Sequence, residues 1–176
     1  MKTLLLLRHA KSSWSEPLDD HDRPLSGRGR RAARAMGELL ADRALQPDRV
    51  LLSTSRRTSE TWGLMAPLLG RPTEVASQGL YLAPAGQLLQ AVREAPGAAE
   101  VLLLIGHNPG IEDLARSLAG GGDPEGLRRL HKKFPTGALA VLDFPSEAWS
   151  DVAPGSGELV SFVRPKDLPE SKRFEG

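Results

Sequence analysis

The feature of the sequence that most constrains its fold is a regular alternation of short apolar runs with longer amphipathic segments. The clearest run, residues 101–105, consists of apolar residues between Glu100 and Gly106, which is typical of a buried strand. Residues 111–118 follow with helical spacing of their apolar positions. Because parallel strands need a crossover between them, this alternation predicts a mostly parallel sheet with helices on both faces.

The same alternation begins near the first residue. We predict further strands at residues 3–7, 50–52 and 74–76, and helices at residues 25–44, 56–69 and 84–94. Ser26 is the expected N-cap of the first helix. Residues 10–24 are polar, contain two prolines and lack helical spacing, so we expect a long loop there.

The later part of the chain departs from this pattern. Residues 138–144 and 158–163 are two strand-like runs, which predict a hairpin-like addition at the edge of the sheet. The glycines at 120–122 are expected to form a flexible loop within one domain, since neither flanking half could fold alone. The expected fold is therefore a three-layer α/β sandwich formed by a single domain over residues 1–176.

Composition excludes several classes of function. The chain has 23 basic and 22 acidic residues, a net charge of +1, which argues against nonspecific nucleic-acid binding. The absence of cysteine excludes disulfides, thiolate metal sites and cysteine nucleophiles. No apolar run is long enough for a membrane span or signal peptide. A chain without cysteine suits a reducing compartment, so the cytoplasm is the expected location. We expect no metal and no cofactor, because no histidine has helical metal-ligand spacing.

Polar residues follow three of the predicted strands at the point where each strand ends. Arg8 and His9 follow the first, residues 53–57 follow the second, and the segment Gly-His-Asn-Pro-Gly at 106–110 follows the strand at 101–105. The carboxyl ends of parallel strands meet at one edge of a sheet, where ligands bind. Two histidines and at least two arginines should therefore converge there.

Phosphoryl transfer is the chemistry that suits this combination. Its transition state spreads negative charge over three oxygens, which guanidinium groups can hold. A neutral imidazole can attack phosphorus and carry the phosphoryl group transiently. Nearby arginines should lower the pKa of that imidazole and keep it neutral near pH 7.

Five segments of the sequence carry a resemblance to a known family. They are LRHAKSSW at 7–14, RPL at 23–25, SxxxRxxxT at 53–61, GHNPG at 106–110 and PTGA at 135–138. Together they resemble the histidine phosphatase superfamily, which has the phosphoglycerate mutase-like fold, and within it the SixA-type phosphohistidine phosphatases. The likeness runs from residue 1 to about residue 163.

The resemblance implies a role for each matching position. It makes His9 the phosphoryl acceptor, Arg8 and Arg57 ligands of the phosphoryl group, and His107 the second histidine that holds its oxygens. Arg23 is implied as a further substrate ligand that reaches the pocket from the long loop. Arg56 falls outside the motif spacing and is expected on the surface.

One departure from the family pattern concerns the general acid. Many relatives carry a carboxylate after the third strand, but residues 79–83 contain none. The acid is either missing or supplied from the long loop, where Glu16, Asp19 and Asp20 are candidates. Loss of an acid hurts alkoxide leaving groups most. The leaving group of phosphohistidine is an imidazole that solvent can protonate. The absence of a carboxylate at residues 79–83 therefore agrees with the SixA-type likeness.

These observations predict a metal-independent phosphatase that acts through a covalent phosphohistidine on His9. The favoured substrate is a phosphohistidine on a protein. One alternative is a phosphomonoesterase acting on a small sugar, nucleotide or terpenoid phosphate, and another is a phosphate-binding protein with little turnover. The expected partners are thus a phosphorylated protein or metabolite, with no nucleic acid and no membrane.

Four other features have more modest interpretations. His21 and His131 lie in polar stretches and are expected to be solvated. The arginine-rich residues 27–31 indicate a basic helix face, which could help to dock an acidic protein. Trp14, in the long loop, could shape the pocket entrance.

Overall fold

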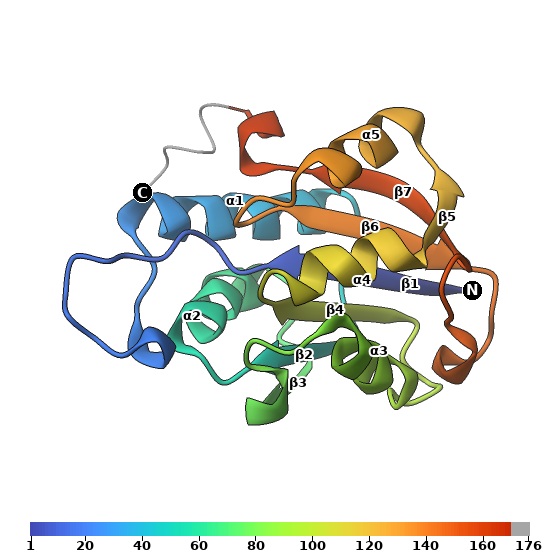
Figure 1. Cartoon of the computed structure of the whole chain (residues 1–176), viewed down its shortest axis with the longest axis horizontal. Coiled ribbons are helices and arrows are strands. Elements are labelled where there is room, and N and C mark those ends of the chain that lie inside the picture. The colour runs from blue at the N-terminus through green and yellow to red at the C-terminus, as the bar shows by residue number, and fades with distance from the viewer. Residues whose placement is uncertain (170–176) are drawn as a thin grey trace.

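The protein is built on a seven-stranded sheet, seen in a computed structural model that describes residues 1–169 (Figure 1). The expected domain also includes residues 170–176, which lie outside the described residues. The strands are β1 (Lys2–Arg8), β2 (Arg49–Ser53), β3 (Thr73–Ser77), β4 (Val101–Gly106), β5 (Ala119–Gly122), β6 (Leu139–Phe144) and β7 (Gly157–Val163). The α-helices are α1 (Gly27–Asp42), α2 (Arg56–Met65), α3 (Ala85–Arg93), α4 (Gly110–Leu118) and α5 (Pro124–Lys132).

The strand order is β3-β2-β4-β1-β6-β7-β5. The pairs β2–β3, β2–β4, β1–β4 and β5–β7 are parallel, whereas β6 is antiparallel to both of its neighbours. Within the described chain, β6 alone runs against the other strands. The expectation of a mostly parallel sheet is confirmed, and the late strands β6 and β7 extend it beyond β1.

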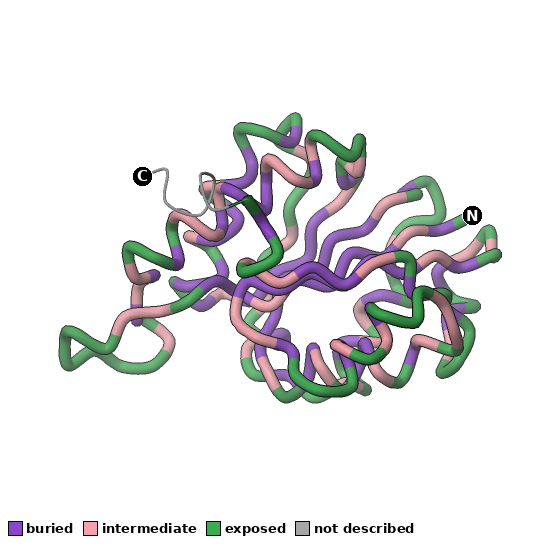
Figure 2. Tube along the Cα trace, turned by 90° about the horizontal axis from the view of Figure 1, so that it is seen from above, coloured by how far each residue is buried: buried purple, intermediate pink, exposed green. Residues whose placement is uncertain are grey.

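The sheet separates two hydrophobic cores. Leu4 and Leu6 of β1 pack with residues of α3, α4 and α5, whereas Leu5 and Leu7 pack with residues of α1 and α2. Successive side chains of a strand point to opposite faces, so one fully apolar strand serves both cores. Figure 2 shows the buried strands passing through the middle of the molecule, between helices with exposed outer residues. The three-layer architecture is therefore confirmed.

Serine side chains fix where α1 and α2 begin. The Ser26 side chain accepts a hydrogen bond from the amide of Gly29 and caps α1, as the sequence predicted. Ser55 caps α2 in the same way by accepting from the Thr58 amide. Because Ser55 follows β2 almost directly, α2 starts at the carboxyl edge of the sheet.

The glycine run at 120–122 is an exception, because the loop prediction was wrong there. These residues form the edge strand β5, which pairs with β7. At Gly122, where φ is 131°, a Cβ atom would lie 2.2 Å from the carbonyl oxygen of Leu159. Glycine permits this close pairing, so a composition typical of a loop here belongs to a strand.

The segment between β1 and α1 projects beyond the carboxyl ends of the parallel strands, at the left of Figure 1. It is a loop with one short 3-10 turn, Asp20–Asp22. Within residues 1–169, no helix combines the length and apolarity that crossing a membrane requires.

Candidate active site

The register of β1 against β4 brings the two motif histidines together. Arg8 pairs with Gly106 in this parallel ladder, so His9 and His107 are the next residues of adjacent strands. The backbone amide of His9 donates to the Gly106 carbonyl at 3.1 Å. The two ring centroids are 5.2 Å apart. The predicted convergence at the sheet edge is thus present.

His9 is held with one ring nitrogen unprotonated. Its Nδ1 lies 2.8 Å from the Ala10 carbonyl oxygen. A carbonyl can only accept, so Nδ1 carries the proton and Nε2 carries the lone pair. The Arg57 Nε–H points at this Nε2, at 3.4 Å. Burial, followed by the positive charges of Arg57, Arg8 and Arg23, lowers the pKa of His9 to about 4, although the Ala10 hydrogen bond opposes this shift.

His107 is held in the opposite tautomer. Arg57 Nη2, which can only donate, lies 3.3 Å from its Nδ1, so the proton sits on Nε2. That Nε2 donates to the Ser53 hydroxyl at 2.7 Å. Burial, the neighbouring His9 and the Arg57 charge lower the pKa of His107 to about 3. Its accepting nitrogen faces Arg57, and both rings are neutral near pH 7.

Arg57 connects the parts of the site. It lies in the first turn of α2, is only 3% exposed, and reaches both histidines with one guanidinium. Thr61, one turn later, donates to the Arg57 carbonyl and accepts from the Ala10 amide. The SxxxRxxxT spacing therefore ties α2 to the segment that carries His9.

The other two predicted arginines also reach the site. Arg8 donates from Nη1 to the Phe134 carbonyl at 2.9 Å, and within residues 1–169 its Nε has no acceptor. Arg23 is buried and donates to the Ser12 hydroxyl at 2.7 Å. Its guanidinium carbon lies 3.4 Å from the centre of the Trp14 ring, which covers it. The loop thus brings Arg23 to the cavity that the two histidines line.

Asp20 is the loop carboxylate that reaches this cluster. Its Oδ1 accepts from Arg23, and its Oδ2 accepts from Arg57 Nη2 and from the Tyr81 hydroxyl. The hydrogen bond from Tyr81, followed by those from the arginines, holds the pKa of Asp20 well below its usual range. Asp20 is therefore ionised near pH 7, which suits a partner of arginines and argues against a proton donor.

The other two loop carboxylates lie apart from the site. Glu16 and Asp19 are exposed, and their side chains form no hydrogen bond or ion pair within the described residues. Tyr81 was not anticipated from the sequence. It follows the short turn Gln78–Leu80 after β3, and a single tyrosine there has no motif spacing that marks it as a site residue.

The two histidines and the three arginines of the site surround a cavity of about 310 Å³ at the sheet edge. No aspartate or glutamate is among the described residues that line it, which are Arg8, His9, Lys11, Ser12, Trp14, Arg23, Arg57, Leu82, His107, Asn108 and Thr136. Trp14 and Leu82 are 76% and 53% exposed. Trp14 thus lies at the rim, where the sequence interpretation had put it.

Three residues outside the cavity test the remaining sequence predictions. Arg56 is half exposed and pairs with Glu60, which confirms its surface position. His131 is exposed, as expected. His21 is only partly solvated: its side chain is 38% exposed, its Nε2 lies 2.8 Å from the Thr54 hydroxyl, and its ring packs edge-on against Tyr81. Its short 3-10 turn folds it back onto the protein.

The donor set of the site suits an anion. Arginine donors and two neutral imidazoles face the cavity, and a tetrahedral oxyanion offers the matching acceptors. In the part of the chain that the structure describes, no group of three or more histidine, cysteine, aspartate or glutamate side chains is arranged to hold a metal ion.

Comparisons with known proteins agree with this arrangement. The family model of the histidine phosphatase superfamily (branch 1) matches residues 4–78. An uncharacterized protein from Mycobacterium tuberculosis is 36% identical over 162 residues, covering 91% of this chain and 100% of the relative.

Solved structures extend the likeness to the whole fold. The proposed phosphohistidine phosphatase SixA from Nakamurella multipartitia is 31% identical, with a TM-score of 0.81 over 93% of this chain and 96% of that one. The protein histidine phosphatase SixA complexed with tungstate, at 23% identity, shares the fold with a TM-score of 0.75, over 95% of this chain and 99% of that one.

Proposed function

Because the chain belongs to the histidine phosphatase superfamily and is SixA-like, we propose that it hydrolyses phosphohistidine on a protein through a covalent intermediate on His9. The observation that carries the proposal is the state of His9. Its ring is neutral, its Nδ1 proton is fixed by the Ala10 carbonyl, and its Nε2 lone pair lies among arginines at the cavity. This is the arrangement that a nucleophilic imidazole needs.

In the first step, His9 Nε2 attacks phosphorus. A bond forms between Nε2 and phosphorus, and the bond from phosphorus to the leaving group breaks with its electron pair going to that group. Arg8, Arg57 and Arg23 donate to the phosphoryl oxygens and offset their charge. His107 orients Arg57 for this contact, because its Nδ1 accepts from Arg57 Nη2.

In the second step, water attacks the phosphorus of the His9 adduct. The bond to Nε2 breaks, the imidazole becomes neutral again, and inorganic phosphate leaves with the protons of the water. The depressed pKa of His9 supports both steps, because it keeps the attacking nitrogen unprotonated and makes the imidazole a good leaving group once phosphorylated.

The choice of substrate rests on the missing proton donor. No carboxyl group is among the described residues that line the cavity, and Asp20 nearby is held ionised by its hydrogen bonds from Tyr81 and the arginines. The leaving group of a phosphomonoester is an alkoxide, and a general acid that protonates it raises the rate about 100- to 10,000-fold. The leaving group of phosphohistidine is an imidazole that solvent can protonate, so the lack of a general acid lowers its rate of hydrolysis much less.

The test compares phosphate release from a histidine-phosphorylated protein with release from a panel of sugar, nucleotide and terpenoid phosphates. We expect kcat/KM to be higher for the phosphohistidine protein by roughly the contribution of one general acid, about 100-fold or more. Equal or better rates on the esters would overturn the substrate assignment and favour the small-molecule alternative. Binding of phosphate with negligible turnover on every substrate would favour the phosphate-binding alternative.

Removal of metal tests a separate part of the proposal. We expect that exhaustive treatment with EDTA leaves phosphate release unchanged, because arginine guanidinium groups supply the donors at the cavity. A rate that falls on chelation and returns on addition of a divalent cation would contradict metal independence.

A further inference from the structure

A second cavity, also of about 310 Å³, adjoins the one that holds His9. The two share Lys11 and Thr136, so the second continues from the rim of the first. We call it the basic groove. It is lined by residues of the loop after β1, of α1, of the end of α5, of the segment before β6 and of the turn after β7, namely Lys11, Arg28, Ala32, Arg129, Lys132, Lys133, Pro135, Thr136, Arg164, Pro165 and Lys166.

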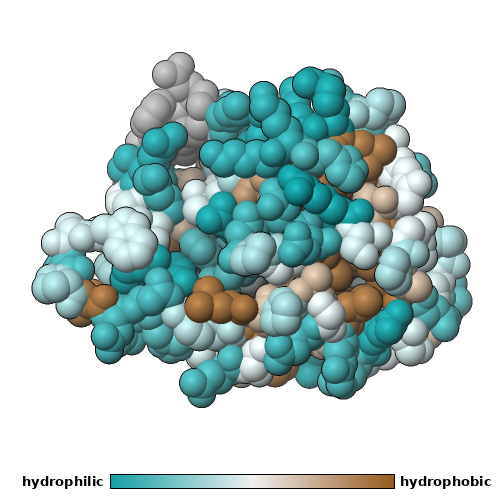
Figure 3. Space-filling view, viewed as in Figure 1, coloured by the Kyte–Doolittle hydropathy of each residue, from teal (hydrophilic) through white to brown (hydrophobic). Residues whose placement is uncertain are grey.

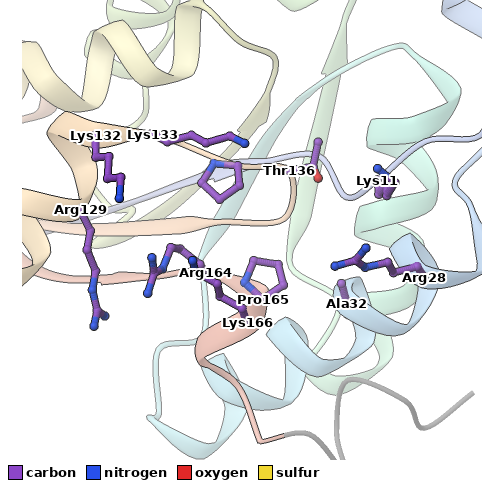
Figure 4. Close-up of a pocket in the computed structure, with 11 residues that line it drawn as sticks. Lys11, Arg28, Ala32, Arg129, Lys132, Lys133, Thr136, Arg164, Pro165 and Lys166 are labelled. Atoms are coloured by element: carbon purple, nitrogen blue, oxygen red, sulfur yellow. The ribbon is translucent and has the colours of Figure 1, made fainter.

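The lining of the basic groove contains seven basic side chains and no acidic one. Figure 4 shows that they come from opposite sides, with Arg129 and Lys132 on one side and Lys11 and Arg28 on the other, around Pro165. Hydrophilic side chains also cover the neighbouring surface over α5 (Figure 3). A chain of net charge +1 therefore places seven of its 23 basic residues around one groove.

Internal ion pairs use only part of this charge. Arg129 pairs with Glu125 at 3.0 Å, and Arg164 pairs with Asp167 at 2.7 Å. The other five basic side chains of the groove form no hydrogen bond or ion pair within residues 1–169; these are Lys11, Arg28, Lys132, Lys133 and Lys166. They are all exposed, so their charge faces whatever approaches the neighbouring cavity.

The character of the surface favours a protein over a small polyanion. The five side chains are mostly lysines, whose flexible ammonium groups suit scattered carboxylates better than a rigid set of phosphate oxygens. On the cavity that holds His9, Trp14 and Leu82 expose apolar surface that a small phosphate would leave uncovered. A protein interface with an apolar contact beside complementary charges uses both features.

We propose that the basic groove docks an acidic surface of the protein that presents its phosphohistidine to His9. This inference rests on the proposed function and adds to it the charge of the partner. Acidic side chains next to the phosphohistidine would lie against Lys132, Lys133 and Arg28 while the phosphoryl group enters the adjoining cavity. The groove then acts on substrate capture and leaves the chemical step unchanged.

The experiment uses two phosphohistidine peptides of equal length, one flanked by glutamates and one by glutamines. For the unmodified protein we expect kcat/KM to be roughly tenfold higher for the acidic peptide, mainly through KM, and the preference to decline with added salt. In Lys132→Glu/Lys133→Glu the preference should disappear, while kcat for an aryl phosphate stays the same. Lys132→Ala/Lys133→Ala should reduce the preference, and this variant replaces the charge-reversal variant if the latter does not fold.

The matched control is Arg30→Glu/Arg71→Glu. Both arginines are exposed, lie outside the two cavities and form no side-chain pair within the described chain. This variant changes the net charge by the same amount, so it should keep the preference for the acidic peptide. Loss of the preference in this control would show that overall charge is responsible, and would overturn the docking proposal.

Competition separates this proposal from the phosphatase assignment. If neither phosphohistidine peptide is hydrolysed, the proposed function fails, and the unphosphorylated peptides still test the groove as inhibitors of aryl phosphate hydrolysis. Stronger inhibition by the acidic peptide, lost in Lys132→Glu/Lys133→Glu, supports docking. Equal inhibition by both peptides overturns it. Inhibition by inorganic pyrophosphate that exceeds that by the acidic peptide, and is lost in the same variant, would instead assign the groove to a small polyphosphate.

Discussion

At the scale of single residues, the site depends on two histidines held in different tautomers. The Ala10 carbonyl fixes the proton of His9 on Nδ1, and the Ser53 hydroxyl accepts the His107 proton from Nε2. Arg57 donates toward the remaining nitrogen of each ring. The unprotonated nitrogen is therefore Nε2 in His9 and Nδ1 in His107, so two identical side chains have different chemistry.

The pH dependence of the rate follows from the pKa of His9. Because attack needs the neutral ring, kcat/KM should hold down to about pH 5 and fall as pH drops through about 4. The Arg57 charge helps to lower this pKa, so Arg57→Gln should move the acid limb to higher pH and reduce kcat roughly 100-fold or more.

The pH profiles of kcat/KM for the unmodified protein and for Arg57→Gln are measured with the same aryl phosphate. The ionisation of that substrate affects both profiles equally, so their ratio reports only the difference between the proteins. An acid limb at the same pH in both proteins would show that Arg57 does not set the charge state of His9.

At the scale of secondary structure, close contacts between elements position the catalytic loops. Gly110 begins α4, directly after the segment that carries His107, and a Cβ atom there would lie 2.0 Å from the Ala83 carbonyl oxygen. Gly110→Ala should therefore destabilise the fold by about 1–3 kcal/mol and reduce activity, because the backbone must shift. Thermal unfolding and kcat/KM measure the two effects.

Gly63→Ala is the matched control for that substitution. Gly63 lies within α2, and a Cβ atom there would meet nothing within 4 Å. The variant should be more stable by about 0.5–1 kcal/mol, because alanine favours the helix, with unchanged activity. If Gly110→Ala were as stable and active as Gly63→Ala, close packing at the start of α4 would not position His107.

Much of this arrangement could be predicted from the sequence, because apolar runs and the residues after them are local signals. The strand β4, the cap at Ser26 and the convergence of His9 with His107 follow from such signals. β5 and the Asp20–Tyr81 contact do not, because each depends on a partner distant in sequence. For β5 that partner is β7, and nothing within the glycine run itself indicates that it pairs with another strand.

At the scale of the whole molecule, burying two neutral histidines links stability to pH. Their pKa values are about 4 and about 3 in the folded protein, against about 6.5 in an unfolded chain. The unfolded chain therefore binds more protons, and the free energy of unfolding should fall as pH drops from about 6.5 toward 4. His107→Gln should flatten that slope, measured by denaturant midpoints.

The control for this linkage is His131→Gln, since His131 is exposed on α5. Its slope should match that of the unmodified protein. Equal slopes in all three proteins would contradict the conclusion that His107 is held neutral by its surroundings.

The central claim is that His9 carries the phosphoryl group, and direct trapping tests it. The protein is mixed with an aryl phosphate, quenched in alkali, which preserves phosphohistidine, and mapped by mass spectrometry. We predict a phosphoryl group on His9 that is lost in acid, and neither adduct nor turnover in His9→Ala, whose circular dichroism remains unchanged. A phosphoryl group on another residue, or continued turnover by His9→Ala, would contradict this account.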